Sequence, residues 1–489
     1  MTDYKALIAD CDQAICSGGA HRVAALLIGL NYSRVPREWA LPLARICRRS
    51  GAWKAGLTLL SKIINSETFG PAASANECAE YGMLLYRFGA TGEAADLLSA
   101  IDPSQAPEAL HYLGLVNLSR WDLPMAIENI NRYIRSSPKS YSELVAKANL
   151  ALAHIENNDT ELASLLLEEV ISLSEKEHQF RILNAALTYR AQLSIHLGDF
   201  KSARSDLERA GRTLESAPSS DRFNFLKLRL ILSAMENKNP SPLEELSSMA
   251  RSGHAWGDVR IADLYSCRIK FEMSLFLKLL FGTPFVGFRN RLLREFQILT
   301  DRDFFYLGFK DAPRLHLSSG QILSGAYAPP GPKSLQFLEV ILRDFYQPLR
   351  IPGVFSALFP LERFNVDSSA DRTHQIINRT RRWLKSQNIP LEIFERDSFY
   401  FLNITGDFSF LLPLERKSVD VMSLHFEKLS HALGSSPSFS ARQARDHLQV
   451  SRHTVQRILT WGLERNLIGK RIQGRAVHYS FIDEQRKAG

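Results

Sequence analysis

Small residues recur along the first half of the chain, each just ahead of an apolar stretch. The steps between them are 38, 32, 37 and 40 residues. Twelve positions before each one lies another small residue, again within an amphipathic helical pattern. This arrangement predicts consecutive helix pairs whose backbones cross closely at the small residues. The earlier members are Ala44, Gly82, Gly114, Ala151 and Ala191, and the later members are Gly56, Ala94, Ala126, Ala163 and Ala203.

A period of this length resembles that of the tetratricopeptide repeat (TPR). The clearest copy is "LHYLGLVNLSRWDLPMAIENINRYIRSSP", in which Leu113–Gly114, Ala126, Ile130 and Pro138 fall on the family's spacing. The other copies are degenerate, so insertions or a neighbouring class of helical repeat stay open. We expect a TPR-like solenoid over residues 1–297, with a concave groove that docks a protein or peptide partner. An irregular helical bundle without a groove is the alternative, and the regular spacing argues against it.

The pattern changes after Thr300. Residues 303–325 alternate apolar and polar side chains between turn signals, which predicts short strands. An amphipathic helix is predicted next, over 333–351, and a short helix over 352–360. A long helix over 368–387 and a β-hairpin over 389–403 complete the segment.

This order of elements resembles the OmpR/PhoB-type winged-helix domain of response regulators, which we expect at residues 298–406. The match is best at "HQIINRTRRWLKSQNIPLEIFERDSFYFL". The resemblance implies that the long helix lies in the major groove of DNA, with Arg379, Arg381 and Arg382 as its basic run. No receiver domain precedes it, and Thr380 stands where the family usually has Leu, so phosphorelay control is not implied.

Helical geometry divides the long helix into two sides. Ile376, Ile377, Thr380 and Leu384 fall on the core side, and His374 and Arg381 lie at the border of the outer side. Arg pairs bidentately with guanine or phosphate, and Asn or Gln reads adenine, so the outer side suits DNA. A solvated basic helix face would look similar. The candidate DNA-binding residues are Gln375, Asn378, Arg379, Arg381, Arg382 and Lys385.

The last segment reads "SFSARQARDHLQVSRHTVQRILTWGLERNLIGKRIQGRAVHYSF". Ser440 and Ser451 are predicted to cap two helices that flank a turn at Gln449–Val450. In the second helix Val455, Ile458 and Leu459 face inward, and Gly462 permits close packing on the same side. A basic hairpin follows.

This order of a helix, a turn, a capped polar helix and a basic hairpin resembles a winged helix-turn-helix of the kind found in MarR and DeoR regulators. We expect such a domain at residues 416–484. Outward groups on the second helix and cations in the hairpin would then contact DNA. Many winged helices bind protein or dimerise instead, which is the alternative. The candidate DNA-binding residues here are Arg452, His453, Gln456, Arg457, Lys470, Arg471 and Arg475.

The charge distribution favours a nucleic-acid partner for the second half. Residues 1–250 hold 26 Lys and Arg against 29 Asp and Glu, whereas residues 251–489 hold 34 against 23. The whole formal excess of +8 therefore lies in the second half. Basic surfaces also meet membranes and acidic proteins, so charge alone does not identify DNA.

The sequence disfavours several classes of protein. The five cysteines form no C-x-x-C pair, which suits reduced thiols in a cytoplasm. Met273–Phe288 is apolar but short and interrupted, so we interpret it as a buried helix and expect no membrane span. No secretory signal or enzyme motif is apparent, and isolated residues such as His111 and His154 are typical of ordinary structural histidines. We expect no enzyme activity, cofactor or metal.

The sequence as a whole predicts a mainly α protein, a TPR-like α-solenoid followed by two small winged-helix (α+β) domains. We expect a cytoplasmic, bacterial transcriptional regulator that binds duplex DNA, with a homodimer as its candidate assembly. Its architecture is similar to that of regulators that couple a winged helix to TPR repeats, although in the antibiotic-regulatory family the winged helix comes first. The alternative is a protein-interaction scaffold whose winged helices mediate assembly.

Overall fold

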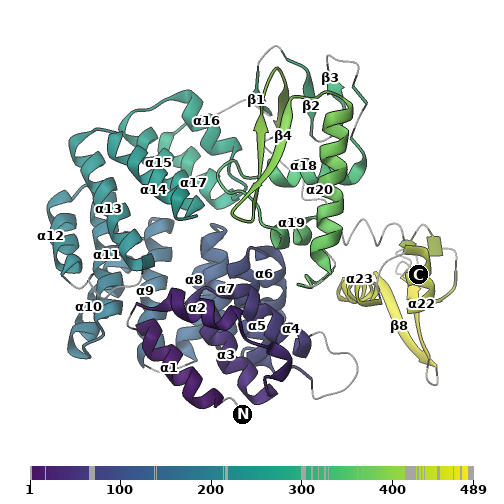
Figure 1. Cartoon of the computed structure of the whole chain (residues 1–489), viewed down its shortest axis with the longest axis horizontal. Coiled ribbons are helices and arrows are strands. Elements are labelled where there is room, and N and C mark those ends of the chain that lie inside the picture. The colour runs from purple at the N-terminus through teal and green to yellow at the C-terminus, as the bar shows by residue number, and fades with distance from the viewer. Residues whose placement is uncertain are drawn as a thin grey trace, which may run out of the picture.

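The computed structural model places an arc of helices around a central space, with a strand-containing part across the opening of the arc (Figure 1). The structure describes residues 3–482 except 17, 65–71, 137, 139, 213, 215–218, 299–303, 310–311, 318, 324–326, 329, 361, 367, 414–425, 427–428, 431, 434–435, 449–451, 466 and 474–475.

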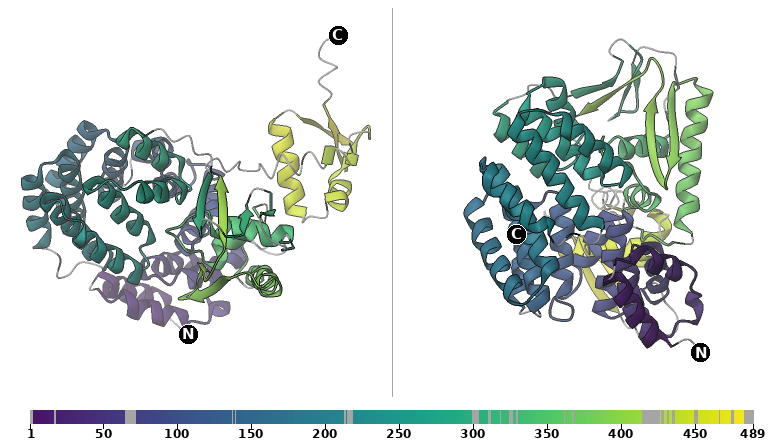
Figure 2. Two further views of the ribbon diagram at one scale, coloured as in Figure 1. Left: turned by 90° about the horizontal axis from the view of Figure 1, so that it is seen from above. Right: turned by 60° about the vertical axis from the view of Figure 1, so that its left-hand side comes forward.

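Residues up to Phe296 form a helical solenoid in which successive helices pack side by side (Figures 1 and 2). Its helices are α1 (Tyr4–Cys16), α2 (Ala20–Ile28), α3 (Arg37–Ser50), α4 (Trp53–Ile64), α5 (Ala75–Phe88), α6 (Thr91–Ser99), α7 (Glu108–Ser119), α8 (Leu123–Arg135), α9 (Ser140–Asn157), α10 (Thr160–Lys176), α11 (Phe180–Leu197), α12 (Phe200–Gly211), α13 (Ser219–Asn237), α14 (Ser241–Ser252), α15 (Trp256–Ile269), α16 (Met273–Phe281) and α17 (Val286–Phe296).

The small-residue pairs predicted from the sequence join consecutive helices, from α3 and α4 through to α11 and α12, and all ten residues are buried. A Cβ built on Gly114 would lie 2.5 Å from Cγ1 of Ile130 in the next helix, and one on Gly82 would lie 2.9 Å from Leu98. The absent side chain is therefore what lets these helices approach. The prediction of a helical solenoid is confirmed.

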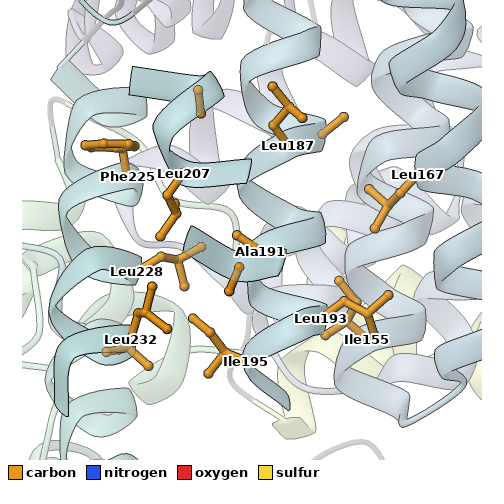
Figure 3. Close-up of a cluster of buried hydrophobic side chains, with 14 of the residues drawn as sticks. Ile155, Leu167, Leu187, Ala191, Leu193, Ile195, Leu207, Phe225, Leu228 and Leu232 are labelled. Carbon is orange, nitrogen blue, oxygen red and sulfur yellow. The ribbon is translucent and has the colours of Figure 1, made fainter. Parts of the chain in front are cut away.

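The core of the solenoid runs along the contacts between neighbouring repeats. Figure 3 shows one stretch of it, where Leu167, Ala191 and Leu207 come from three different helices and belong to one continuous layer of buried apolar side chains. Such a layer is what stacked repeats need, since one helix pair cannot cover its own apolar face.

The apolar segment at Met273–Phe288 forms α16, a turn and the start of α17, and Phe276, Leu279 and Phe288 are fully buried. The prediction of a buried helix there is confirmed. No helix in the described ranges is long and apolar enough to cross a membrane.

The middle module comprises the elements from β1 to β6. They are β1 (Phe304–Gly308), β2 (Arg314–His316), β3 (Ile322–Leu323), α18 (Pro332–Ile341), α19 (Ile351–Leu358), α20 (Ser369–Ser386), β4 (Leu391–Arg396), β5 (Phe399–Ile404) and β6 (Ser409–Pro413). One sheet has the order β1-β6-β2-β3, with β6 antiparallel to β1 and parallel to β2, while β4 and β5 form a hairpin.

Two features of this module differ from the expectation. The helix expected over 333–351 ends at Ile341, because Asp344 Oδ1 accepts the backbone N–H groups of Tyr346 and Gln347 and holds the chain in a turn. Strand β6 lies beyond residue 406, yet it is the strand that joins β1 to β2.

The C-terminal module, residues 426–482, lies at the outside of the molecule (Figure 2). It contains β7 (Phe439–Ser440), α22 (Ala441–Leu448), α23 (Arg452–Glu464), β8 (Ile468–Gln473) and β9 (Ala476–Phe481), with strand order β7-β9-β8. Ser440 caps α22 as predicted, because its Oγ accepts from Gln443 N at 3.3 Å and Gln443 Oε1 accepts from Ser440 N at 2.8 Å. The turn expected at Gln449–Val450 and the cap expected at Ser451 lie outside the described residues.

The middle module is docked on the solenoid at two places. At the N-terminal part of the arc, both carboxylate oxygens of Glu93 on α6 lie 3.0 Å from the backbone N of Phe364, and Phe355 joins the core of α3–α5. At the other part, Asp344 forms a 2.5 Å ion pair with Arg260 on α15, a residue 3% exposed. The module therefore bridges the arc and closes it into a ring (Figure 1).

Candidate nucleic-acid interface and central cavity

The outer side of α20 carries polar and basic groups, whereas its inner side is packed. Ile376, Ile377, Thr380 and Leu384 are buried, as helical geometry predicts. Among the described residues, no carboxylate forms an ion pair with the basic groups of the outer side. The exposed residues are His374, Gln375, Asn378, Arg379, Arg382 and Lys385.

Arg381 lies differently from its neighbours. It is half-buried, its Nε donates to the carbonyl of Ile393 on β4 at 2.9 Å, and its guanidinium lies 6.0 Å from the ring of Tyr400. These contacts fasten α20 to the β4–β5 hairpin. Helical geometry placed Arg381 at the border of the outer side, which agrees with its half-buried position, but it did not predict the bond to Ile393.

The β4–β5 hairpin is packed on the solenoid. Phe399 and Phe401 each have their ring centroid 5.7 Å from Trp256 at the start of α15, and Phe399 also contacts His254. In this arrangement the end of the hairpin that contains Phe399 packs against the solenoid and not against solvent. The outer side of α20 stays exposed beside the docked hairpin and presents basic groups to solvent.

In the C-terminal module, Val455, Ile458 and Leu459 form the core face of α23, as predicted. A Cβ on Gly462 would lie 2.5 Å from the ring of Phe426, so the glycine permits the close packing that the sequence indicated. Of the candidate DNA-binding residues, Arg452, Gln456, Lys470 and Arg471 are exposed, while the side chain of His453 and the whole of Arg475 lie outside the described residues.

Arg457 points away from the core of its own module and contacts the rest of the chain. Its Nη2 lies 3.6 Å from Oδ2 of Asp96 on α6, and its Nη1 donates to the carbonyl of Pro360 at 3.3 Å. The Asp96 side chain is 65% exposed, so this is a solvated contact of small energy. Nothing in the sequence predicts this contact, because its residues lie far apart in the chain.

The ring surrounds a cavity of about 2730 Å³ that is partly open to solvent. Its wall combines the inner side of the solenoid with α18, α19 and the segment between them. Many of its charges are paired within the protein: Lys227 with Asp258, and Arg291 with Glu156. The repeat pattern predicted a groove, but it did not predict that the middle module closes it into a ring.

Some cations of the cavity wall have no such partner. Arg87, Arg120, Arg343 and Arg350 line the cavity, and no described carboxylate forms an ion pair with any of them. Burial lowers the pKa of Arg343, and the nearby charge of Arg120 lowers it further, against the opposing effect of Asp344. Burial also lowers the pKa of Arg350, whose Nε is enclosed without a hydrogen-bond partner.

His111 and His154 are held by contacts with other residues of the solenoid. His111 is buried, its ring stacks on Tyr133 with centroids 5.1 Å apart, and burial lowers its pKa to about 4. His154 Nδ1 lies 3.0 Å from Asp159 Oδ2. In the part of the chain that the structure describes, no three His, Cys, Asp or Glu side chains come together as metal ligands.

No protein-family model matches the chain, and no curated protein matches it either. Among solved structures, the chain is similar to a monomeric mutant of IFIT1 with Gppp-AAAA, at 13% identity. The match covers 93% of this chain and 88% of that chain, with a TM-score of 0.29. A likeness this loose carries no argument about function, so the solenoid rests on the helix contacts described above.

Proposed function

We propose that the protein is a DNA-binding transcriptional regulator. In this proposal the middle and C-terminal modules are winged-helix modules that contact duplex DNA, and the solenoid senses a ligand or docks a partner. The single observation that carries the proposal is the exposed outer side of α20, where Arg379, Arg382 and Lys385 have no carboxylate partner among the described residues.

The chemistry of that side suits a nucleic acid. Arg groups bind phosphate or guanine bidentately, and Gln375 and Asn378 offer the amide groups that read adenine. Thr380 and Leu384 anchor the opposite side of the helix, so the outer groups are held on a rigid element. Because the hairpin beside α20 is docked on α15, the helix itself would carry the DNA contacts of the middle module.

The C-terminal module adds a second basic surface. Arg452 and Gln456 extend from α23, and Lys470 and Arg471 extend from β8. Two modules on one chain raise affinity through effective concentration and lengthen the footprint. In the arrangement described here Arg457 is engaged by Asp96, so DNA contact by Arg457 requires that contact to open.

The test is a binding titration of the full chain with duplex genomic fragments at several salt concentrations. Displacement of phosphate counterions gives a log–log slope of about −0.9 for each phosphate contacted. We expect a steep slope and a preference for some fragments. The alternative is a protein-interaction scaffold, and it predicts no measurable binding to any duplex at low salt.

A further inference from the structure

Three parts of the chain meet at the side chain of Arg457. This residue lies on α23 of the C-terminal module, and its guanidinium contacts an acceptor in each of the other two parts. Nη2 lies 3.6 Å from Oδ2 of Asp96 on solenoid helix α6. Nη1 donates at 3.3 Å to the carbonyl of Pro360, which lies between α19 and α20 of the middle module. The complete contact therefore forms only while the solenoid and the middle module lie together.

The docking of the middle module on the solenoid brings the two acceptors together. Four residues after Pro360, the backbone N of Phe364 lies 3.0 Å from each carboxylate oxygen of Glu93, one turn of α6 before Asp96. The Phe364 side chain is buried in the same apolar core as α3–α5. The hydroxyl group of Ser356, near the end of α19, also donates to Glu93 at 3.4 Å. These contacts place the Pro360 carbonyl beside Asp96.

The charges around Asp96 suit a guanidinium partner. Burial raises the pKa of Asp96, and the charge of Arg457, followed by that of Arg120 at the end of α7, opposes this rise. Glu93, the carboxylate one turn away, is itself engaged by the middle module. Among the described residues, Arg457 is the cation that forms an ion pair with Asp96.

This contact uses the helix of the C-terminal module that we expect to bind DNA. In both views α23 lies on the side of that module that faces the rest of the molecule, while Arg452 and Gln456 on the same helix stay exposed (Figures 1 and 2). A phosphate that binds the Arg457 guanidinium must take the place of Asp96, because both need the same donors. Asp96 would also repel the phosphates of an approaching duplex. The docked position of Arg457 therefore excludes its contact with DNA.

We propose that Asp96 and the carbonyl group of Pro360 form an internal docking site for Arg457, and that this site restrains DNA binding by the C-terminal module. A solvated ion pair is a weak restraint, so we expect it to lower DNA affinity about two- to fivefold. Because the site needs the solenoid and the middle module together, a partner that loosens their contact would free α23. The docking stands on the contacts above, whereas the restraint rests on the proposed function.

The docking is tested without DNA, in the full chain with Arg457→Lys. A water-soluble carbodiimide joins a carboxylate to an amine in contact with it, so we expect an amide bond between the introduced amine and Asp96. Mass spectrometry of the monomeric product identifies the bond. A further Asp96→Asn change should remove this crosslink, whereas Glu128→Gln, at an exposed carboxylate on α8, should leave it. Absence of the crosslink to Asp96 overturns the docking.

The restraint is tested by duplex titration of the parent, Asp96→Asn, Arg457→Ala and the double variant. We expect Asp96→Asn to bind about two- to fivefold more tightly than the parent, and to have no such effect in the Arg457→Ala chain. Glu128→Gln removes the same charge at a distant exposed site and should match the parent.

Two results overturn the restraint. One is parent-like affinity of Asp96→Asn, and the other is an equal gain with and without Arg457, which indicates a general effect of charge. If the crosslink forms but no chain binds DNA, the proposed function and the restraint fail together while the docking stands. If the chain binds DNA without the crosslink, the docking fails and the proposed function stands.

Discussion

At the residue scale, the repeat depends on positions where a side chain is missing. Gly114 and Gly82 lie where a neighbouring helix presses an Ile or Leu against the backbone. This is why the pattern of small residues could be read from the sequence: the requirement is local, steric and repeated at each helix pair. By contrast, nothing local marks the contacts of Arg457, because its partners Asp96 and Pro360 come from distant parts of the chain.

Gly114→Ala should destabilise the protein. The added Cβ would meet Cγ1 of Ile130 at 2.5 Å, and we expect a loss of about 1–3 kcal/mol in the free energy of unfolding. Gly257→Ala on α15 is the matched control, because a Cβ there meets nothing within 4 Å and the change should be neutral or slightly stabilising. Chemical denaturation measures both, and equal stability of the two variants would contradict the close-crossing explanation.

Glu93 should make the stability depend on pH. Burial raises its pKa to about 7, even though the Phe364 N–H group, Arg363 and Ser356 favour the charged form. The folded protein therefore binds this proton more tightly than the unfolded chain, whose Glu has a pKa near 4.5. The stabilisation is full below about pH 4.5 and is lost as the pH rises through about 7.

Glu93→Gln should remove that part of the pH dependence. The difference between the pKa of Glu93 in the folded state and in the unfolded state corresponds to at most about 3 kcal/mol of stability. Water around the half-buried side chain makes the actual contribution smaller. Melting temperatures of parent and variant at pH 5 and at pH 8 measure it, with the exposed Glu244→Gln as control. If the Glu93 variant and the parent show the same change between the two pH values, the carboxyl group does not titrate as described.

At the element scale, the helices and strands with strong local sequence patterns form where they were predicted. The amphipathic pattern predicted α20, and alternation with a turn predicted β4 and β5. The prediction of a helix over 333–351 was wrong in its second half. Asp344 accepts a backbone N–H group there, which holds the chain in a turn, and it also pairs with Arg260. Strand β6 was missed because its pairing with β1 and β2 depends on the fold rather than on its own short sequence.

Two adjacent arginines of α20 should respond differently to removal. Arg381→Ala removes the bond from Nε to the Ile393 carbonyl, so it should lower stability by about 1–2 kcal/mol. Arg382→Ala removes an exposed side chain, so it should leave stability within about 0.5 kcal/mol of the parent and weaken DNA binding. Denaturation and DNA titration of both variants check this. The same loss of stability in both would mean that helix geometry does not separate their roles.

At the scale of the whole molecule, the docked middle module makes the candidate DNA-binding surface and the solenoid parts of one ring. The module shares apolar cores with the solenoid at both ends, through Phe355 at one and Tyr346 at the other. A ligand or partner that alters the ring can therefore change how α20 is presented. The solenoid and the middle module could each be predicted from sequence patterns. Their contact could not, because the residue pairs that form it lie far apart along the chain.

Asp344→Ala should loosen the ring. It leaves Arg260 buried without its partner, and removing one member of a buried ion pair costs about 3–5 kcal/mol. We expect a lower melting temperature and faster hydrogen exchange in β4 and β5. Asp10→Ala, at an exposed carboxylate, is the control. Unchanged exchange in the hairpin would show that this ion pair does not hold the module in place.

The most direct test of DNA binding through α20 is the salt dependence of duplex binding by the full-length Arg379→Ala/Arg382→Ala variant. Beside it we would measure the parent and Arg132→Ala, whose site is exposed on the solenoid. Loss of two phosphate contacts should flatten the log–log slope by about two, with weaker binding at every salt concentration. The Arg132 variant should match the parent. A double variant with the parent's slope and affinity would contradict the account.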